Sequence, residues 1–308
     1  MVELHKLIKA LTAKFVAATS MKVLQSLTIE NFYDIENILI LNHSGQISYT
    51  QAGKQESIKP GELLFIPSRK LITITYGHTD AVDLAFDYFL ENRWKYLQMI
   101  PQPTTPTPFD SLSYITFDVR VFETINLFTI IAPPALAIKD NDRLSYIAQS
   151  ILAENEAQEV GKEQALTSNT QLLAIELLRH MYNKSWIADQ LAMHYNYFKD
   201  TRLTNIIHYI CEHLGEDLSN KKLAAIANTS EDYMGQYFKF IMGISPQEYV
   251  ELQRMEQAIK LLRTTTTPIN KISKEVGFKD TAYFCKRFKL RFGISAGKLR
   301  NSEAQLAI

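Results

Sequence analysis

The sequence has little cysteine, no long apolar run and no excess of charge of either sign. Its 308 residues include only two cysteines, Cys211 and Cys285, which is too few for a disulfide framework and favours a reducing cytoplasm. No apolar segment approaches the roughly 20 residues that span a bilayer, and residues 1–20 lack the uninterrupted apolar block of a signal peptide. Basic and acidic residues balance at 33 each, which argues against a polybasic protein.

The charge is nevertheless unevenly distributed along the chain. Residues 1–200 carry 17 basic and 22 acidic side chains, whereas residues 201–308 carry 16 basic and 11 acidic ones. The two parts therefore have formal net charges of −5 and +5. The length allows two domains, and we expect the basic one to be the partner of a polyanion.

The first part of the chain predicts a small β-rich domain. Short apolar or alternating segments are separated by glycine and proline at 38–41, 47–50, 63–66, 71–76 and 115–121. Strands at intervals of about ten residues predict a sandwich or barrel over residues 1–135.

Helical spacing of apolar residues occurs in three places of the first 200 residues. Residues 4–15 predict an amphipathic helix packed on the β-rich domain, and residues 92–100 also read as a helix. Residues 136–200 predict a helical segment. Its helices either cover the β-rich domain or pair with a second copy of the chain, and we expect a dimer contact within 143–182.

An internal repeat with a fixed offset of 50 lies in the basic part. Residues 233–245 and 283–295 are identical at six of thirteen positions. Each copy follows a helix-capping residue, Ser230 or Asp280, and each contains a glycine suited to the left-handed end of a helix.

A short helix and a tight turn precede each copy, over 220–229 and 268–278, so each unit reads as a helix-turn-helix. Apolar residues expected in the two cores are Leu223, Ile226, Met234 and Phe238, and Ile272, Val276, Phe284 and Phe288. The intervening helix, 246–263, spans roughly 27 Å at about 1.5 Å per residue. Successive major-groove faces of B-DNA lie roughly 34 Å apart, so one chain is expected to place two helices in adjacent turns of a duplex.

The basic part also carries a family resemblance. The residues that carry it are Leu223, Ala224, Ser230, Phe238, Lys239, Gly243, Ser245, Tyr249, Arg254, Ala258, Leu261, Leu262, Ile269, Ile272, Gly277, Phe278, Asp280, Tyr283, Phe284, Phe288, Lys289, Gly293 and Arg300. With them, residues 202–300 resemble the DNA-binding domain of the AraC/XylS family of bacterial transcription regulators. Residues 42–67 are similar to the cupin-like sensor barrel of that family.

The resemblance implies an α+β multidomain fold. It places a cupin-like β-barrel in 1–135, a helical linker and dimerisation segment in 136–200, and an all-α domain with two helix-turn-helix units in 201–308. It also implies a cytoplasmic, bacterial, non-enzymatic regulator without a cofactor. The implied partners are double-stranded operator DNA, a small-molecule effector, a second copy of the chain and RNA polymerase.

The solvent side of each second helix supplies the candidate DNA contacts. Base-facing candidates are Thr281, Ala282, Cys285 and Lys286 in the second unit, which are also the family's groove-facing positions, and Glu231, Asp232, Gly235 and Gln236 in the first. Phosphate-binding candidates are Lys239, Lys279, Lys289, Arg291 and Lys298. The family usually has a basic residue where Gln236 stands. We therefore expect the first unit to read little sequence or to discriminate through rejection, and the second unit to supply most of the attraction to DNA. A merely solvated basic face is the alternative.

The β-rich domain offers weaker functional signals. Candidate effector-pocket residues are Tyr33, Asn42, Tyr49, Phe65, Arg69 and Tyr76, for which ordinary core or rim packing is the alternative. His43 and His78 are too far apart in sequence for the two closely spaced histidines of a cupin metal site, so no metal is expected. A ligand-independent DNA-binding protein with a dimerising barrel, or a cupin-type enzyme, remain rival functions.

Overall fold

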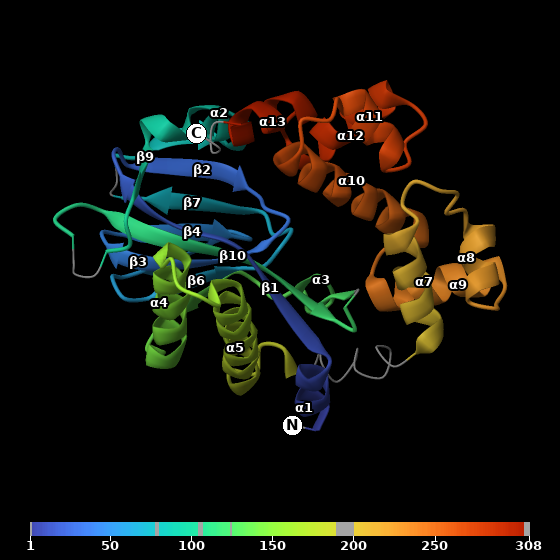
Figure 1. Cartoon of the computed structure of the whole chain (residues 1–308), viewed down its shortest axis with the longest axis horizontal. Helices are drawn as coiled ribbons and strands as arrows, with labels where there is room; N and C mark the ends of the chain where they lie inside the picture. Colours follow the sequence, from blue (N-terminus) through green and yellow to red (C-terminus); the bar gives the residue numbers. More distant parts are fainter. Residues whose placement is uncertain (1, 78–79, 104–106, 124, 189–199, 305–308) are drawn as a thin grey trace. The chain divides into compact units, whose positions relative to one another are not determined.

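The computed structural model describes residues 2–77, 80–103, 107–123, 125–188 and 200–304 and divides into two units, Met1–Leu191 and Ala192–Ile308 (Figure 1). The first unit is rich in strands and the second is helical. The predicted order, a β-rich domain followed by a helical domain with two helix-turn-helix units, is confirmed.

Two sheets form the first unit. The seven-stranded sheet has the order β12-β6-β3-β10-β1-β9, with β11 beside β10, and the five-stranded sheet has the order β5-β4-β7-β2-β8. The strands of the first are β1 (Leu11–Val23), β3 (Asn37–Ser44), β6 (Leu63–Ile66), β9 (Leu97–Ile100), β10 (Ser111–Val121), β11 (Ile125–Asn126) and β12 (Leu136–Ile138). Those of the second are β2 (Leu27–Phe32), β4 (Ile47–Gln51), β5 (Lys54–Ile58), β7 (Ile72–Tyr76) and β8 (Val82–Ala85). In the described chain each strand pairs only within its own sheet, so of the sandwich or barrel predicted from the strand pattern the structure has the sandwich, and its two sheets do not close into a barrel.

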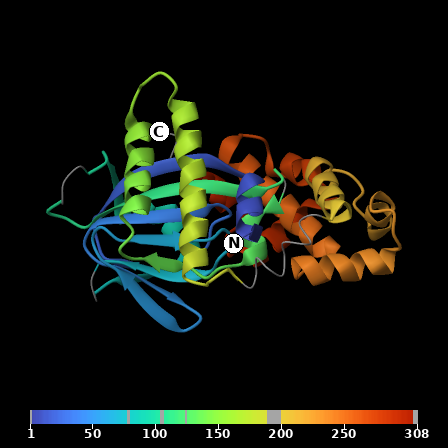
Figure 2. The same cartoon turned by 90° about the horizontal axis from the view of Figure 1, so that it is seen from below.

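Two long helices, α4 (Asp142–Glu156) and α5 (Lys162–Asn183), run side by side over one face of the strands (Figure 2). Gln171 of α5 fastens this layer to β1, because its side chain accepts a hydrogen bond from Ala13 N and donates one to Leu11 O, both at 2.8 Å. Leu173 and Leu177 of α5 are fully buried. The helices expected in 136–200 therefore bury their apolar faces within their own chain.

Local helical spacing misled the prediction at two places. The first helix, α1, spans Val2–Lys9 and ends where β1 begins, so Leu11 and Phe15 lie in a strand. Phe15 stands opposite Phe117 in the β1–β10 ladder, and that long-range pairing overrides the local pattern. Residues 86–100 form α2 (Phe86–Asn92), a short 3₁₀ helix (Arg93–Lys95) and β9, and a further helix, α3 (Leu127–Ile131), was not predicted.

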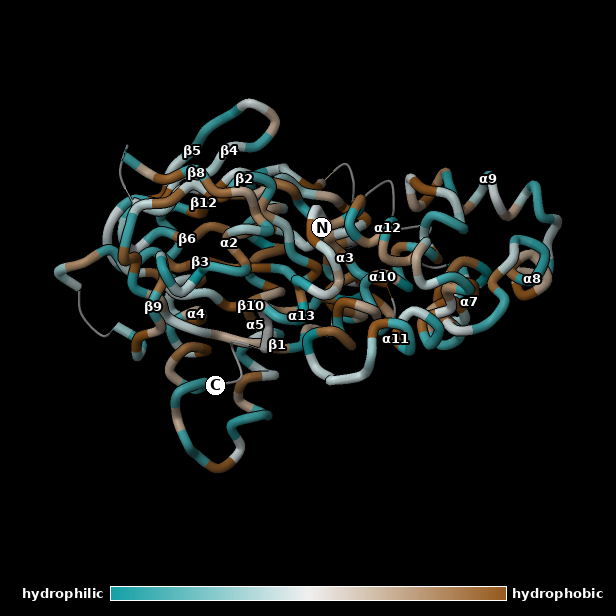
Figure 3. Tube along the Cα trace, turned by 90° about the horizontal axis from the view of Figure 1, so that it is seen from above, coloured by the Kyte–Doolittle hydropathy of each residue, from teal (hydrophilic) through white to brown (hydrophobic). Residues whose placement is uncertain are grey.

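The second unit contains the predicted helices. They are α7 (Thr201–Glu212), α8 (Asn220–Ile226), α9 (Glu231–Met242), α10 (Pro246–Thr264), α11 (Ile269–Glu275), α12 (Thr281–Phe292) and α13 (Ala296–Ala304). Hydrophobic and hydrophilic residues alternate along them (Figure 3). Seven of the eight expected core residues are buried to within 1% exposure, and Ile226 is half-buried. The two repeated units thus have equivalent cores.

Candidate nucleic-acid interface

The helices α9 and α12 are held in equivalent ways at both ends. The side chain of Ser230 caps α9 and that of Asp280 caps α12, each accepting a hydrogen bond from the backbone N–H three residues on. Gly243 ends α9 with φ +73°, and Gly293 ends α12 with φ +72°. Both glycines occupy the left-handed region that other residues adopt at a cost.

The predicted base-facing residues of α12 differ in what they can offer. Ala282 and Lys286 are exposed, whereas Thr281 and Cys285 are half-buried. The Thr281 hydroxyl lies 2.9 Å from Oγ of the buried Ser273 on α11. Thr281 therefore joins the two helices of the unit, and Lys286 is the exposed cation of this set.

An ion pair fixes α12 against α10. Arg287 Nε donates to Glu251 Oε1 at 2.8 Å, and this hydrogen-bonded carboxylate raises the pKa of Arg287. Because Arg287 is occupied by Glu251, it orients the helix while its neighbour Lys286 stays exposed to solvent.

The corresponding side of α9 is acidic and polar. Glu231, Asp232 and Gln236 are exposed. A Cβ added at Gly235 would meet no atom within 4 Å, so packing does not require a glycine there. The four positions predicted to face DNA thus present two carboxylates, one amide and one bare backbone position.

The predicted phosphate-binding residues are exposed throughout; they are Lys239, Lys279, Lys289, Arg291 and Lys298. Lys239 and Arg291 lie close enough to Glu248 to help lower its pKa, after the larger effect of hydrogen bonds with Ser245 at the start of α10. One cation from each helix-turn-helix unit therefore lies near the first turn of α10, the helix that connects the two.

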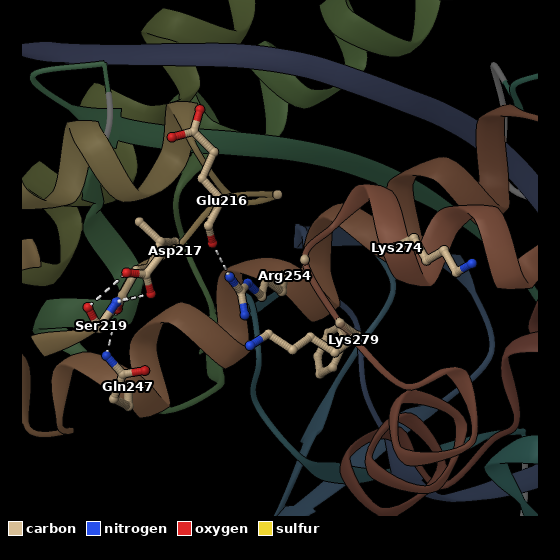
Figure 4. A pocket seen from close by; sticks show the side chains of 11 residues that line it. Glu216, Asp217, Ser219, Gln247, Arg254, Lys274 and Lys279 are labelled. Atoms are coloured by element: carbon tan, nitrogen blue, oxygen red, sulfur yellow. Dashed lines mark hydrogen bonds between the residues drawn. The ribbon is translucent and has the colours of Figure 1, made fainter.

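A joint next to a cavity of about 650 Å³ connects the two helix-turn-helix units (Figure 4). Arg254 of α10 donates from Nε to Leu214 O at 2.9 Å and from Nη2 to Glu216 O at 2.8 Å. Gly277, in the turn between α11 and α12, has φ +94°, and a Cβ there would lie 2.2 Å from Leu214 O. The turn between α11 and α12 thus touches the backbone of the loop before α8, and this turn and this loop are both in contact with Arg254 of α10.

A group at the start of α7 was not predicted from the sequence. Asp200 caps α7 and accepts two further hydrogen bonds from Arg202, from Nε at 3.1 Å and from Nη2 at 2.7 Å. The Tyr237 hydroxyl of α9 donates to the same carboxylate. The Arg202 guanidinium lies over the rings of Tyr233 and Tyr237, 5.7 and 5.3 Å from their centroids. The one local sequence signal for this group is Asp200, because aspartate is a favoured residue at the start of a helix.

The candidate effector residues are spread over the first unit. Tyr49 and Tyr76 lie on the inner face of the five-stranded sheet, where Tyr76 accepts a hydrogen bond from Tyr114 of the opposite sheet at 2.5 Å. Asn42 is buried and donates to Gly45 O and Ile58 O.

The other three candidates lie elsewhere. Phe65 is buried against Phe117 and Phe128, with ring centroids 6.3 and 5.0 Å away. Tyr33 and Arg69 are half-buried loop residues, and Arg69 has a left-handed φ of +67°. The six residues therefore do not line one common pocket.

Tyr49 lines a cavity of about 470 Å³ together with Gln51, Lys54, Lys70 and Trp186. Its hydroxyl donates to Glu56 at 3.1 Å and accepts from Ala137 N at 3.1 Å. Burial, followed by the charge of Glu56, raises its pKa well above the usual range. A second cavity, of about 560 Å³, shares Ala137 and Trp186 with the first.

His43 lies 2.6 Å from Ser113 Oγ through Nε2, and burial lowers its pKa. His78 lies outside the described residues. Over the described ranges, no three histidine, cysteine or acidic side chains are grouped as metal ligands, and no helix there has the length and apolarity needed to cross a membrane.

Sequence comparison matches residues 223–302 to the family described as a helix-turn-helix domain. An uncharacterized HTH-type transcriptional regulator of Haemophilus influenzae is 23% identical over 268 residues, which are 87% of either chain. The arabinose operon regulatory protein of Escherichia coli K12 is 34% identical over 134 residues, which are 42% of this chain and 44% of that protein.

Structure comparison shows a shared fold over nearly the whole chain. ToxT from Vibrio cholerae matches with a TM-score of 0.53 at 11% identity, covering 94% of this chain and 98% of ToxT. ToxT with a bound unsaturated fatty acid matches with a TM-score of 0.52 at 10% identity and 94% coverage of both. The chain therefore contains a helix-turn-helix domain over residues 223–302 and is similar to transcription regulators, among them the arabinose operon regulatory protein.

Proposed function

We propose that this protein reads a specific DNA sequence with α9 and α12 and regulates transcription in response to a small molecule. The single observation that carries the DNA-reading part is the pair of equivalently capped helices, joined through one helix of 19 residues. Arg254 of α10 is hydrogen-bonded to the loop before α8, and we propose that this joint keeps the two helices at one spacing. With DNA as its partner, the proposed location is the bacterial cytoplasm.

The proposal assigns different roles to the two reading helices. Lys286 of α12 donates to guanine O6 and N7, and Ala282 contacts a thymine methyl group. On α9, Gln236 reads adenine and Glu231 accepts a hydrogen bond from cytosine N4, while Asp232 repels nearby phosphates. The second helix-turn-helix unit therefore supplies most of the affinity for DNA, and the first helix-turn-helix unit discriminates among sequences.

Genome-wide mapping of bound sites would supply the operator for a direct test. In gel-shift titrations at fixed salt, Lys286→Ala should cost about 1–3 kcal/mol of binding free energy and Gln236→Ala clearly less. Lys9→Ala, an exposed lysine in the first unit, is the matched control for the lost charge. Equal or reversed losses for the two helices would contradict the division of roles. About six neutralised phosphates predict a log–log salt slope near −5.

We propose the cavity beside Tyr49 as the effector site. Lys54 and Lys70 line it, and Lys139 and Lys184 line the adjoining cavity beyond Trp186. Glu56 also lines the first cavity and Asp140 the second, so the four ammonium groups outnumber the carboxylates by two. This excess favours a small organic anion, with Trp186 contacting its apolar part. ToxT, which shares the fold, has been solved with an unsaturated fatty acid.

Thermal unfolding of the full chain in the presence of organic acids, sugars and aromatic compounds tests this site. An organic anion should raise the unfolding temperature, and Lys70→Ala should abolish the rise, whereas Lys9→Ala should retain it. If no compound stabilises the protein and DNA binding ignores every cell-extract fraction, the rival function stands. The first unit would then serve dimerisation alone.

A homodimer and contact with RNA polymerase complete the proposal. The outer side of α4 exposes Tyr146, whose side chain is 71% exposed, and that of α5 exposes Leu172. Apolar side chains on the outside of a helix pair favour a contact between copies. Sedimentation of the full chain with and without Tyr146→Glu tests this, since the substitution should convert a dimer to a monomer.

A further inference from the structure

We propose that Arg202, at the start of α7, binds a DNA phosphate beside α9 and so supplies a cation next to the base-facing positions of that helix, none of which is basic. The inference rests on the DNA binding proposed above. It adds a contact from outside both helix-turn-helix motifs, with a phosphodiester oxygen as its ligand.

The position of Arg202 is set by α9 itself. Its guanidinium lies over two tyrosine rings of that helix, Tyr233 and Tyr237, which are stacked 5.6 Å apart with an interplanar angle of 10°. Tyr233 is 46% exposed and is followed three residues later by Gln236, so these two side chains are neighbours on the helix surface. Arg202 is therefore held next to the residues expected to face DNA.

Arg202 keeps donors available for a second acceptor. A guanidinium has five N–H groups, and the Asp200 carboxylate takes one from Nε and one from Nη2. Tyr233 is a further hydrogen-bond partner of this side chain, which is 45% exposed. Two of the five N–H groups therefore remain for the oxygens of a phosphate.

Asp200 acts as a positioning residue and not as a competitor for the phosphate. Its carboxylate accepts from the backbone N–H of Arg202, from Nε and Nη2 of the Arg202 guanidinium and from the Tyr237 hydroxyl. These interactions, first among them those of the Arg202 side chain, hold the pKa of Asp200 well below its usual range. The carboxylate thus stays ionised and compensated, and it fixes the orientation of the guanidinium.

Comparison with the second helix-turn-helix unit shows why only the first would need an arginine from outside the motif. The position of Gln236 is taken by Lys286 in α12, which already carries a cation there. The position of Tyr237 is taken by Arg287, which pairs with Glu251 of α10. In both helix-turn-helix units an arginine therefore fixes the reading helix to an earlier helix, α9 to α7 and α12 to α10. In the first unit the arginine lies on the preceding helix, and part of its guanidinium remains available.

The test measures the salt dependence of DNA binding. If Arg202 only holds α9 in place and does not contact DNA, its loss leaves this salt dependence unchanged. Binding of the full chain to a random-sequence duplex of about 30 base pairs, enough for several turns, is followed by fluorescence anisotropy between about 50 and 300 mM KCl. One lost phosphate contact lowers the log–log slope by about 0.9. Arg202→Gln should show that loss and bind about tenfold more weakly at the low-salt end, whereas Arg202→Lys should keep the slope.

Arg179→Gln is the matched control. Arg179 is also half-exposed and paired with a carboxylate, that of Glu176, but it lies on α5 of the first unit. An unchanged slope in Arg202→Gln with an unchanged unfolding temperature would refute the phosphate contact, and so would an equal loss in Arg179→Gln. If Arg202→Gln fails to fold, Arg202→Met retains an aliphatic stem without the charge and carries the same test. Absence of any binding by the unaltered protein would instead overturn the proposed function.

Discussion

Replacing Gly277 by alanine should loosen the joint between the two helix-turn-helix units. The new Cβ would lie 2.2 Å from Leu214 O and 2.7 Å from two atoms of the Arg254 guanidinium, on a backbone with φ +94°. Adopting that φ costs about 1–2 kcal/mol, and displacing a charged donor from a carbonyl costs about 1.5–3 kcal/mol. The expected destabilisation is therefore about 2.5–5 kcal/mol, a large share of the 5–15 kcal/mol typical of a domain.

Gly293→Ala is the control, since Gly293 has φ +72° but no atom within 4 Å of its added Cβ. It should show only the backbone cost of about 1–2 kcal/mol. Both tryptophans, Trp94 and Trp186, lie in the first unit. Urea unfolding followed by circular dichroism should therefore shift in the Gly277 variant while the tryptophan transition stays in place. Equal losses in the two variants would refute the close approach at Gly277.

Three further predictions concern the reading helices and the helix between them. Gly235→Ala should raise stability by about 0.5–1 kcal/mol, because the position is helical and open; a loss in urea unfolding would contradict this. Thr281→Val should cost about 1 kcal/mol by removing the partner of Ser273, and a purely DNA-reading threonine would leave stability unchanged. Hydrogen bonds with Ser245 lower the pKa of Glu248, so its stabilisation is present near neutrality and lost as pH falls through the lowered value. Glu248→Gln should then lower the melting temperature near neutral pH and leave it unchanged in strong acid.

The second unit was predictable because its signals are local. Ser230 and Gly243 mark the ends of α9, and Asp280 and Gly293 mark those of α12, within one helix length of each other. The repeat at an offset of 50 then doubled each signal. The Arg202 group escaped prediction because it joins α7 to a helix about 30 residues further along, and no spacing rule relates two separate helices.

The first unit was less predictable because sheets depend on distant partners. Strand periodicity indicates alternating faces but not which face meets which neighbour. Phe65 was assigned to a ligand pocket, yet its ladder places it with Phe117 on the face covered by α3. Tyr49, an alternating aromatic of the same kind, instead lines a cavity. The sequence identifies both as inward-facing residues, and only the pairing of strands separates them.

The joint gives the acidic first helix a role that it could not have alone. Gly277 and Arg254 fix both helix-turn-helix units to α10. On the proposed function, binding of α12 then brings α9 to the next groove without a second loss of translational freedom. Favourable contacts by α9 are then not needed for attachment, and its carboxylates can act by rejecting unsuitable base pairs. Loosening the joint should therefore reduce discrimination between operator and random DNA more than it reduces binding to random DNA.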